Sequence, residues 1–133
     1  AVADKEKLLA IWATFRNLGK EIIYQTHVDL PVLKIIGQLP SAVILGGYVA
    51  YQQKFNSAPA DFDKVHLYAS DLAEIRKRFP PNKGLVNLIV VKSDDYLKFY
   101  NHQLPLAQLY ADLWNFKEWQ GKDFLEALKK KIF

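Results

Sequence analysis

The 133-residue sequence predicts an α/β (α+β) fold in which a mixed central sheet is flanked by helices. Three short apolar runs have the length and composition of strands: SAVIL (residues 41–45), KVHLYAS (64–70) and LVNLIVV (85–91). Segments with helical periodicity separate these runs and follow them to the C-terminus. Strands that alternate with helices favour one sheet covered by helices. We therefore expect the three strands to be adjacent and two C-terminal helices to pack on the sheet.

The first element expected is an amphipathic helix over residues 4–19, with Asp4 as its N-cap and Gly19 at its end. Its apolar side chains recur at the i, i+3 and i+4 spacing of one helix face, which predicts that this face packs on the rest of the domain. The face comprises Leu8, Ile11, Trp12, Phe15 and Leu18.

The next three elements expected are a strand, a short helix and a second strand. EIIYQTHV (21–28) has the β-branched and aromatic composition of a strand. DLPVLKIIGQ (29–38) predicts a short helix opened by Asp29, with Pro31 tolerated in its first turn and Gly37 at its end. The fully apolar run SAVIL is then typical of a buried strand in the centre of a sheet.

Helical patterns account for most of the remaining chain. One helix is expected at residues 47–55, beginning at the second residue of a glycine pair, and another at 71–79, between two of the strands. The C-terminal third predicts two more helices, at 104–119 and 121–133, each with its apolar side chains on one face. These faces comprise Leu106, Leu109, Tyr110, Leu113 and Trp114 in the first helix, and Phe124, Leu125, Leu128 and Ile132 in the second.

Composition bounds the class of protein. The length suits a single domain over residues 1–133, and because the sequence begins with Ala1 rather than Met, we expect the C-terminal part of a longer chain. The longest apolar runs fall short of the ~20 residues that cross a bilayer, so we expect a cytoplasmic protein without membrane contact. The absence of Cys excludes disulfides and thiolate metal sites.

Two sets of charged or titratable residues have ordinary explanations. The net charge is +4, and its densest cluster runs from Lys129 to Lys131 in the last predicted helix. Cations there complement the helix dipole, so a solvated helix end explains the cluster, and a nucleic-acid contact is the alternative. His27, His66 and His102 lie far apart without a partner at metal-ligand spacing, which predicts surface or strand histidines.

The stretch from Gly46 to Asp63 has the pattern of a phosphate and metal site. A tight glycine turn between a strand and a helix exposes backbone N–H groups at the positive end of the helix, where a phosphate can bind. Asp61 and Asp63 lie just before the next strand, one residue apart, so both carboxylates can hold one divalent cation. Three interpretations of the aspartates stay open: a plain turn, a relic metal site and a working site.

GGYVA followed by DFD resembles the glycine pair and D-x-D motif of the nucleotidyltransferase superfamily, especially its minimal and AbiEii-like toxin branch. The resemblance implies nucleotide binding at Gly46 and Gly47, and metal binding with catalysis at Asp61 and Asp63. Two departures oppose activity. The family usually has a basic residue and a Ser or Thr just before the first aspartate, where this sequence has SAPA. The family also needs a third carboxylate on a following strand, where this sequence has Asn87.

A second resemblance covers nearly the whole chain. LLAIWATF, AVILGGYVAY, KVHLYAS, GLVNLIVV and LPLAQLYADLWNFKEWQGKDFLEALKKKI are similar to the C-terminal domain of AbiEi-type antitoxins and related transcriptional regulators. This resemblance implies a nucleotidyltransferase-like domain without catalytic competence and without a cofactor, which acts through protein contacts with a toxin or with itself. DNA would be bound by an N-terminal winged-helix domain that precedes these residues.

Two other functions remain open. One is an active metal-dependent nucleotidyltransferase that uses Asp61 and Asp63 with Mg²⁺, for which Asp95 is a candidate further ligand. The other is an interaction module of no assigned class. A winged helix encoded upstream would favour the regulator over the enzyme.

Overall fold

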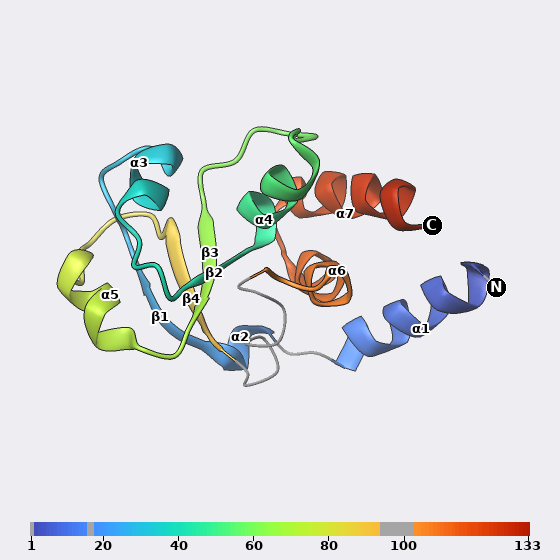
Figure 1. Ribbon diagram of the computed structural model, residues 1–133, viewed down its shortest axis with the longest axis horizontal. Coiled ribbons are helices and arrows are strands. Elements are labelled where there is room, and N and C mark those ends of the chain that lie inside the picture. Colours follow the sequence, from blue (N-terminus) through green and yellow to red (C-terminus); the bar gives the residue numbers. More distant parts are fainter. Residues whose placement is uncertain (1, 16–17, 94–102) are drawn as a thin grey trace.

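The computed structural model describes residues 2–15, 18–93 and 103–133. Its strands are β1 (Ile22–Thr26), β2 (Ile44–Gly46), β3 (Val65–Ala69) and β4 (Leu88–Lys92). In the described residues they form one four-stranded sheet with the order β1-β4-β3-β2 (Figure 1). β3 and β4 are parallel, and each outer strand is antiparallel to its neighbour. The predicted mixed sheet is confirmed, as is the adjacency of the three apolar strands.

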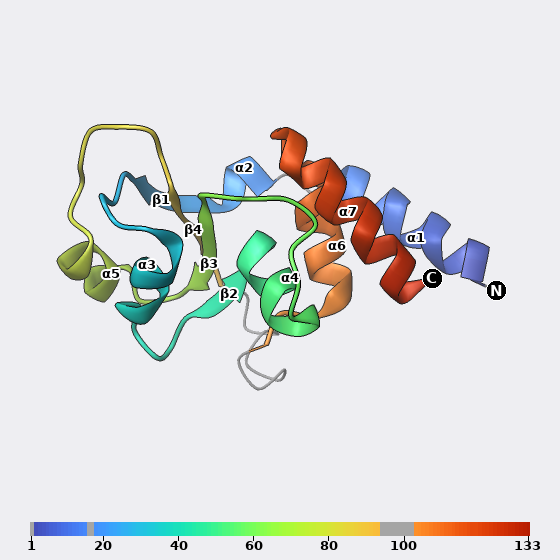
Figure 2. The same cartoon turned by 90° about the horizontal axis from the view of Figure 1, so that it is seen from above.

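The helices in the described residues are α1 (Val2–Phe15), α2 (Leu18–Glu21), α3 (Val32–Gly37), α4 (Gly47–Phe55), α5 (Leu72–Arg78), α6 (Leu106–Asn115) and α7 (Trp119–Ile132). α3 and α5 lie on one side of the sheet, whereas α4, α6 and α7 lie on the other and α1 packs against α6 (Figure 1, Figure 2). The predicted packing of the two C-terminal helices on the sheet is confirmed. None of the helices in the described part of the chain has the length and apolar character needed to cross a membrane.

Two hydrophobic clusters lie on opposite faces of the sheet and explain why its inner strands are apolar. One cluster includes Tyr68 and Val91 and packs against α6 and α7. The other includes Leu67 and Val90 and packs against α3 and α5. In the parallel register Leu67 is opposite Val90 and Tyr68 is opposite Val91, so each cluster takes alternate residues of both strands. Covered on both faces, all five residues of β3 are buried.

The first helix differs from the prediction in its limits and in its packing face. Asp4 lies within α1, and Gly19 lies within α2, which leads directly into β1. The side chains of Leu8, Ile11 and Trp12 are 67%, 50% and 42% exposed. The prediction that these three residues pack on the domain was therefore wrong.

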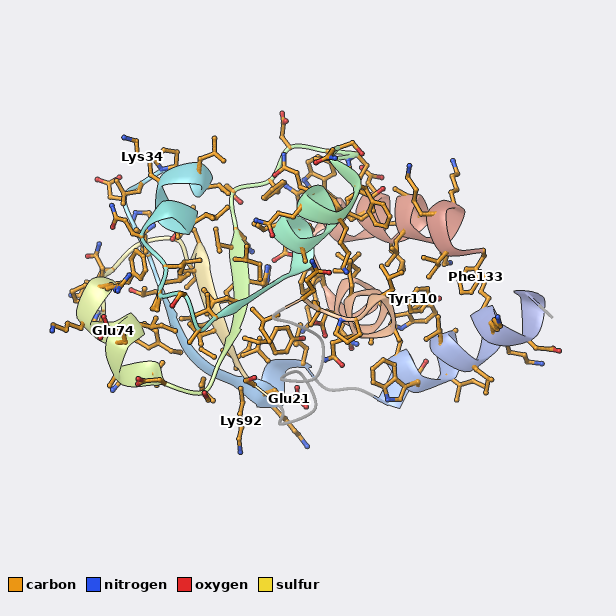
Figure 3. All side chains as sticks on the ribbon, in the orientation of Figure 1. Glu21, Lys34, Glu74, Lys92, Tyr110 and Phe133 are labelled. Atoms are coloured by element: carbon orange, nitrogen blue, oxygen red, sulfur yellow. The ribbon has the colours of Figure 1, made fainter. Side chains whose placement is uncertain are left out.

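A small residue explains how α1 packs instead. Ala13 is fully buried, and its backbone carbonyl accepts a 3.1 Å hydrogen bond from the side-chain amide of Asn115 in α6. Leu9, one turn before Ala13, is partly buried against the same cluster, so α1 contacts α6 through the face that carries these two residues. α6 also contacts the C-terminal residue that follows α7: the ring centroids of Tyr110 and Phe133 are 6.2 Å apart (Figure 3).

Two shorter elements also differ from their predictions. β2 is an edge strand rather than a central one. It is nevertheless apolar because both of its faces are covered: Ile44 is buried in one cluster, and Val43 and Leu45 pack against the other. α3 begins after Pro31, whose carbonyl accepts the first-turn hydrogen bonds, so Asp29 is not its N-cap.

Candidate functional site

The predicted turn between a strand and a helix is present at Gly46 and Gly47, where β2 ends and α4 begins. Gly47 has a φ of +53°, which favours glycine. A Cβ atom on Gly47 would lie 2.9 Å from His66 Nδ1 and 3.0 Å from Phe116 Cζ, and one on Gly46 would lie 3.0 Å from the Tyr68 ring. Aromatic side chains therefore fill the space beside both glycine α-carbons.

Asp61 and Asp63 lie in the loop between α4 and β3, and both are exposed. In the described part of the chain, no group of three or more His, Cys, Asp or Glu side chains is placed to hold a metal ion. Asp95, the candidate further ligand, lies outside the described residues, as does His102, which was predicted to be a surface or strand histidine. The loop thus presents two carboxylates to solvent at the entrance to β3.

Asn87, at the position expected for a third carboxylate, is used to hold two segments of the chain together. Its side-chain oxygen accepts a 2.7 Å hydrogen bond from the Val28 N–H, and its side-chain nitrogen donates a 2.7 Å bond to the Val28 carbonyl. Its own carbonyl accepts from the N–H of Val65 at 2.7 Å. The amide thereby joins the end of β1 to the start of β4, and both of its polar atoms are engaged.

A polar cluster lies next to the aspartate loop and links three elements. Lys64 directly follows Asp63 and donates a 2.5 Å hydrogen bond to Glu118 Oε1. Tyr48, the second residue of α4, donates a 2.8 Å bond to Glu118 Oε2. Glu118 immediately precedes α7, so this Tyr48–Lys64–Glu118 cluster joins the start of α4, the aspartate loop and the start of α7.

The electrostatics of the cluster favour an ionised glutamate and a neutral tyrosine. Burial alone would raise the pKa of Glu118, but the hydrogen bonds from Lys64 and Tyr48 outweigh it and lower that pKa below its usual value. Burial raises the pKa of Tyr48 far above its ordinary range, and the Glu118 and Asp63 carboxylates add to the effect. Tyr48 therefore serves as a hydrogen-bond donor and stays protonated at neutral pH.

His66 lies beneath this cluster in β3 and is only 5% exposed. Its ring stacks on Phe116 with a centroid distance of 4.3 Å, and its Nδ1 has no hydrogen-bond partner in the described residues. Burial lowers the pKa of His66 to about 4, a shift that Glu118 opposes and Lys64 reinforces. The imidazole is therefore neutral at physiological pH. The prediction of a strand histidine is confirmed.

A second buried polar group fastens α6 to the sheet. Asp112 is 2% exposed, and its carboxylate accepts a hydrogen bond from the Tyr68 hydroxyl of β3. Gln108 donates to the same hydroxyl at 3.2 Å. Since Tyr68 also covers Gly46, this group fixes the position of the glycine turn relative to α6.

Sequence reasoning placed the glycine turn and the aspartate loop but missed the residues that connect them. Lys64 and Glu118 are 54 residues apart, so no local spacing pattern relates them. The only available signal was the position of Lys64 directly after the DFD motif. Comparison with known proteins assigns no role to these residues, since no protein-family description, curated protein or solved structure matches the chain.

Proposed function

We propose that this chain is a catalytically inactive, nucleotidyltransferase-like regulatory or antitoxin-type domain that acts through protein contacts. The observation that carries the proposal is the position of Asn87, whose side-chain oxygen already accepts a hydrogen bond from Val28. Nucleotidyl transfer needs metal ions held by several oxygen ligands in near-octahedral order. Asp61 and Asp63 supply exposed carboxylates, but a neutral and engaged amide where the third is expected does not fit a Mg²⁺ cage.

The surroundings of the glycine turn support the same conclusion. In an active nucleotidyltransferase, open space beside such a turn lets the backbone approach a triphosphate. Here His66 and Phe116 lie 2.9 and 3.0 Å from where a Cβ of Gly47 would be. The glycines therefore serve close packing of the domain on itself. The alternative function, an active metal-dependent enzyme using Asp61 and Asp63, lacks this supporting geometry.

Exposed apolar side chains on α1 support a role in protein contact. Leu8, Ile11 and Trp12 follow i, i+3, i+4 spacing, and their exposure is 42% or more. Exposed apolar side chains that gather on one helix face can mark a surface that contacts another protein. We take self-association of this chain as the contact to test, and a toxin is the alternative partner that the resemblance implies.

A label-transfer assay tests the absence of catalysis. The chain is incubated with each labelled nucleoside triphosphate, Mg²⁺ or Mn²⁺, and RNA or protein acceptors. We expect no transfer above background, with no difference between the wild type and the Asp61→Ala and Asp63→Ala variants. Robust transfer that both substitutions abolish would overturn the proposal and establish the enzyme.

Sedimentation velocity over a concentration series tests the contact surface. The wild type should self-associate, and Trp12→Glu should remain monomeric because it places a charge in the apolar stripe. Leu33→Glu is the matched control, since Leu33 is 81% exposed on α3, on the other side of the sheet. A monomeric wild type at all concentrations, or equal behaviour of the two variants, would contradict this contact.

The DNA part of the proposal places sequence-specific binding in a preceding winged-helix domain. Residues 1–133 alone should then bind duplex DNA weakly, without sequence preference, and should lose that binding steeply as salt rises. Fluorescence anisotropy with an operator and a scrambled duplex measures the difference. Tight, sequence-selective binding by these residues would show that they carry the DNA-reading element themselves.

A further inference from the structure

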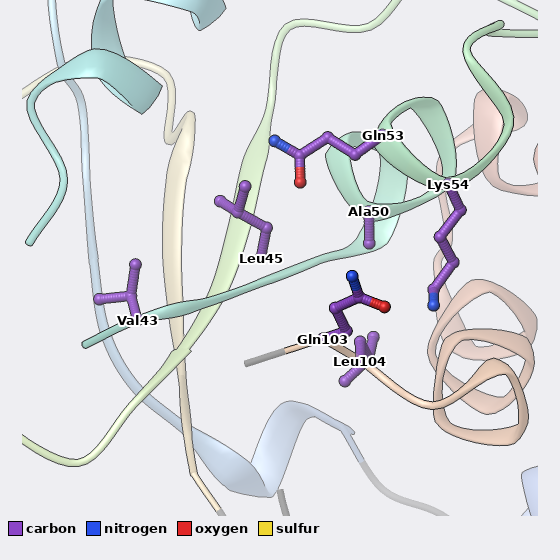
Figure 4. Close-up of a pocket in the computed structure, with 7 residues that line it drawn as sticks. All are labelled: Val43, Leu45, Ala50, Gln53, Lys54, Gln103 and Leu104. Carbon is purple, nitrogen blue, oxygen red and sulfur yellow. The ribbon is translucent and has the colours of Figure 1, made fainter. Parts of the chain in front are cut away.

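A hollow follows the free edge of the sheet beside β2 and is separate from the aspartate loop (Figure 4). It has a volume of about 340 Å³, and its walls come from β2, from α4 and from residues 103–104. A second hollow of about 240 Å³ begins at Pro40 and shares Val43 with the first. The second hollow lies before the start of β2, between residues 40–43, the end of β3 and α5.

The regular geometry of β2 and α4 builds the walls of the first hollow. Val43 and Leu45 are alternate residues of an extended segment, so they line the same side of it. Ala50, Gln53 and Lys54 are spaced i, i+3 and i+4 and therefore share one face of α4. β2 ends the sheet order, so one row of its backbone N–H and C=O groups has no neighbouring strand among the described residues.

The chemistry of the lining fits a carboxylate with apolar neighbours. Lys54 points into the hollow, where Gln53 and Gln103 add two amide groups (Figure 4). Among the described residues, Lys54 forms no ion pair. Val43 and Leu45 offer apolar surface beside it. When a peptide adds to the edge of a sheet, main-chain hydrogen bonds supply the affinity and contacts with its alternate side chains supply the specificity.

We infer that this groove binds an extended peptide segment of a partner protein that carries an acidic side chain. The segment adds to the edge of β2, its apolar residues lie over Val43 and Leu45, and its carboxylate pairs with Lys54. The inference rests on the proposed function and deepens it, because it names the chemistry of a second partner surface. This surface is distinct from the apolar stripe of α1.

The test is an NMR titration of the ¹⁵N-labelled chain with an acetylated, amidated hexapeptide of alternating valine and glutamate. Amide shifts should change at residues 43–46 and 50–54. Lys54→Gln should weaken binding by about fivefold, the effect of losing one partly screened charge pair. Lys34→Gln, an exposed lysine on α3, is the matched control and should bind as the wild type does. A peptide with glutamine in place of glutamate should bind to the wild type about as weakly as the glutamate peptide binds to Lys54→Gln.

Several results would overturn the inference. These are shifts that are absent or centred elsewhere, equal binding of the glutamine peptide, and equal binding by Lys54→Gln. Shifts at residues 43–46 that depend on protein concentration without peptide would show that a second copy occupies the groove. The label-transfer assay tests the proposed function separately. Transferase activity together with peptide binding would refute only the proposed function. A chain that neither transfers label nor binds the peptide would refute only this inference.

Discussion

Acidification should destabilise the fold through His66, whose environment disfavours the charged imidazole. The side chain is 5% exposed, and burial lowers its pKa from 6.5 to about 4, with Glu118 opposing the shift and Lys64 reinforcing it. The folded state therefore binds this proton less readily than the unfolded state. It follows that the stability is fully present above the unfolded pKa of 6.5 and is lost as the pH falls toward 4.

The pKa shift from 6.5 to about 4 corresponds to a loss of about 3 kcal/mol in the free energy of unfolding once the pH is well below 4. Between about pH 7.5 and pH 4.5 the loss is about 2.5 kcal/mol. Urea unfolding followed by circular dichroism at these two pH values measures the loss. The wild type should lose about 2.5 kcal/mol more than His66→Phe, which keeps an aromatic ring against Phe116 without a titrating group. Carboxylates that do not interact with His66 are the same in both proteins, so the difference reports the imidazole together with its interaction with Glu118.

His27→Gln is the control for loss of a histidine, because the His27 ring hydrogen-bonds the exposed Leu85 carbonyl and the variant keeps His66. It should show the same acid sensitivity as the wild type. The reasoning is refuted if His66→Phe loses as much stability on acidification as the wild type does.

Three further substitutions test other contacts by urea unfolding. Glu118→Gln should lower the free energy of unfolding by about 1 kcal/mol at neutral pH, because it removes the ion pair with Lys64. The difference in stability from the wild type should shrink as acid protonates the wild-type carboxylate. Gly47→Ala should cost about 2 kcal/mol because φ is +53° and the new Cβ meets His66, whereas Gly37→Ala, with open space around it, should be neutral or slightly stabilising. Asn87→Asp should cost about 2 kcal/mol, since a carboxylate cannot donate to the Val28 carbonyl, and should confer no nucleotidyl transfer. A fully stable Gly47→Ala or Asn87→Asp would contradict the packing and the amide contact described above.

The fold was predictable where local pattern and tertiary packing agree. The helix at residues 47–55 was predicted with the limits that the structure shows, because the glycine pair Gly46–Gly47 ends the strand before it, and in the structure Asn56 caps it in a left-handed conformation. β3 was predictable because burial on both faces demands an apolar run. The position of β2 at the edge of the sheet was not predictable, because an edge strand whose two faces are covered is as apolar as a central strand.

The packing of α1 shows a second limit of sequence patterns. Periodicity identifies an apolar face, but it does not say which face the rest of the chain will cover. Here the buried contact uses Ala13, and the larger apolar side chains Leu8 and Trp12 are exposed. A rule that ranks faces by hydrophobicity selects Leu8, Ile11 and Trp12, whereas the structure buries the face that carries Leu9 and Ala13.

The candidate site was predictable in outline from Gly46, Gly47, Asp61 and Asp63, and their roles in ligand binding remain predictions. What the sequence could not reveal is what fills the space between them. Glu118 reaches Tyr48 and Lys64 only because the chain returns after α6, and no spacing rule links residues that far apart. The role of Asn87 likewise depends on Val28, which belongs to a different part of the chain.

The hydrogen bond from Asn115 to the Ala13 carbonyl joins positions 102 residues apart, which has a consequence for the nascent chain. A ribosome adds roughly 5–20 residues per second, so α1 emerges several seconds before the helix on which it packs. During that interval Ala13 lacks the helix that buries it in the folded domain. β3, α5 and β4 are contiguous and can pair as soon as residue 92 has left the exit tunnel. Although α1 is synthesised before every other described helix, it docks only after α6 has been made.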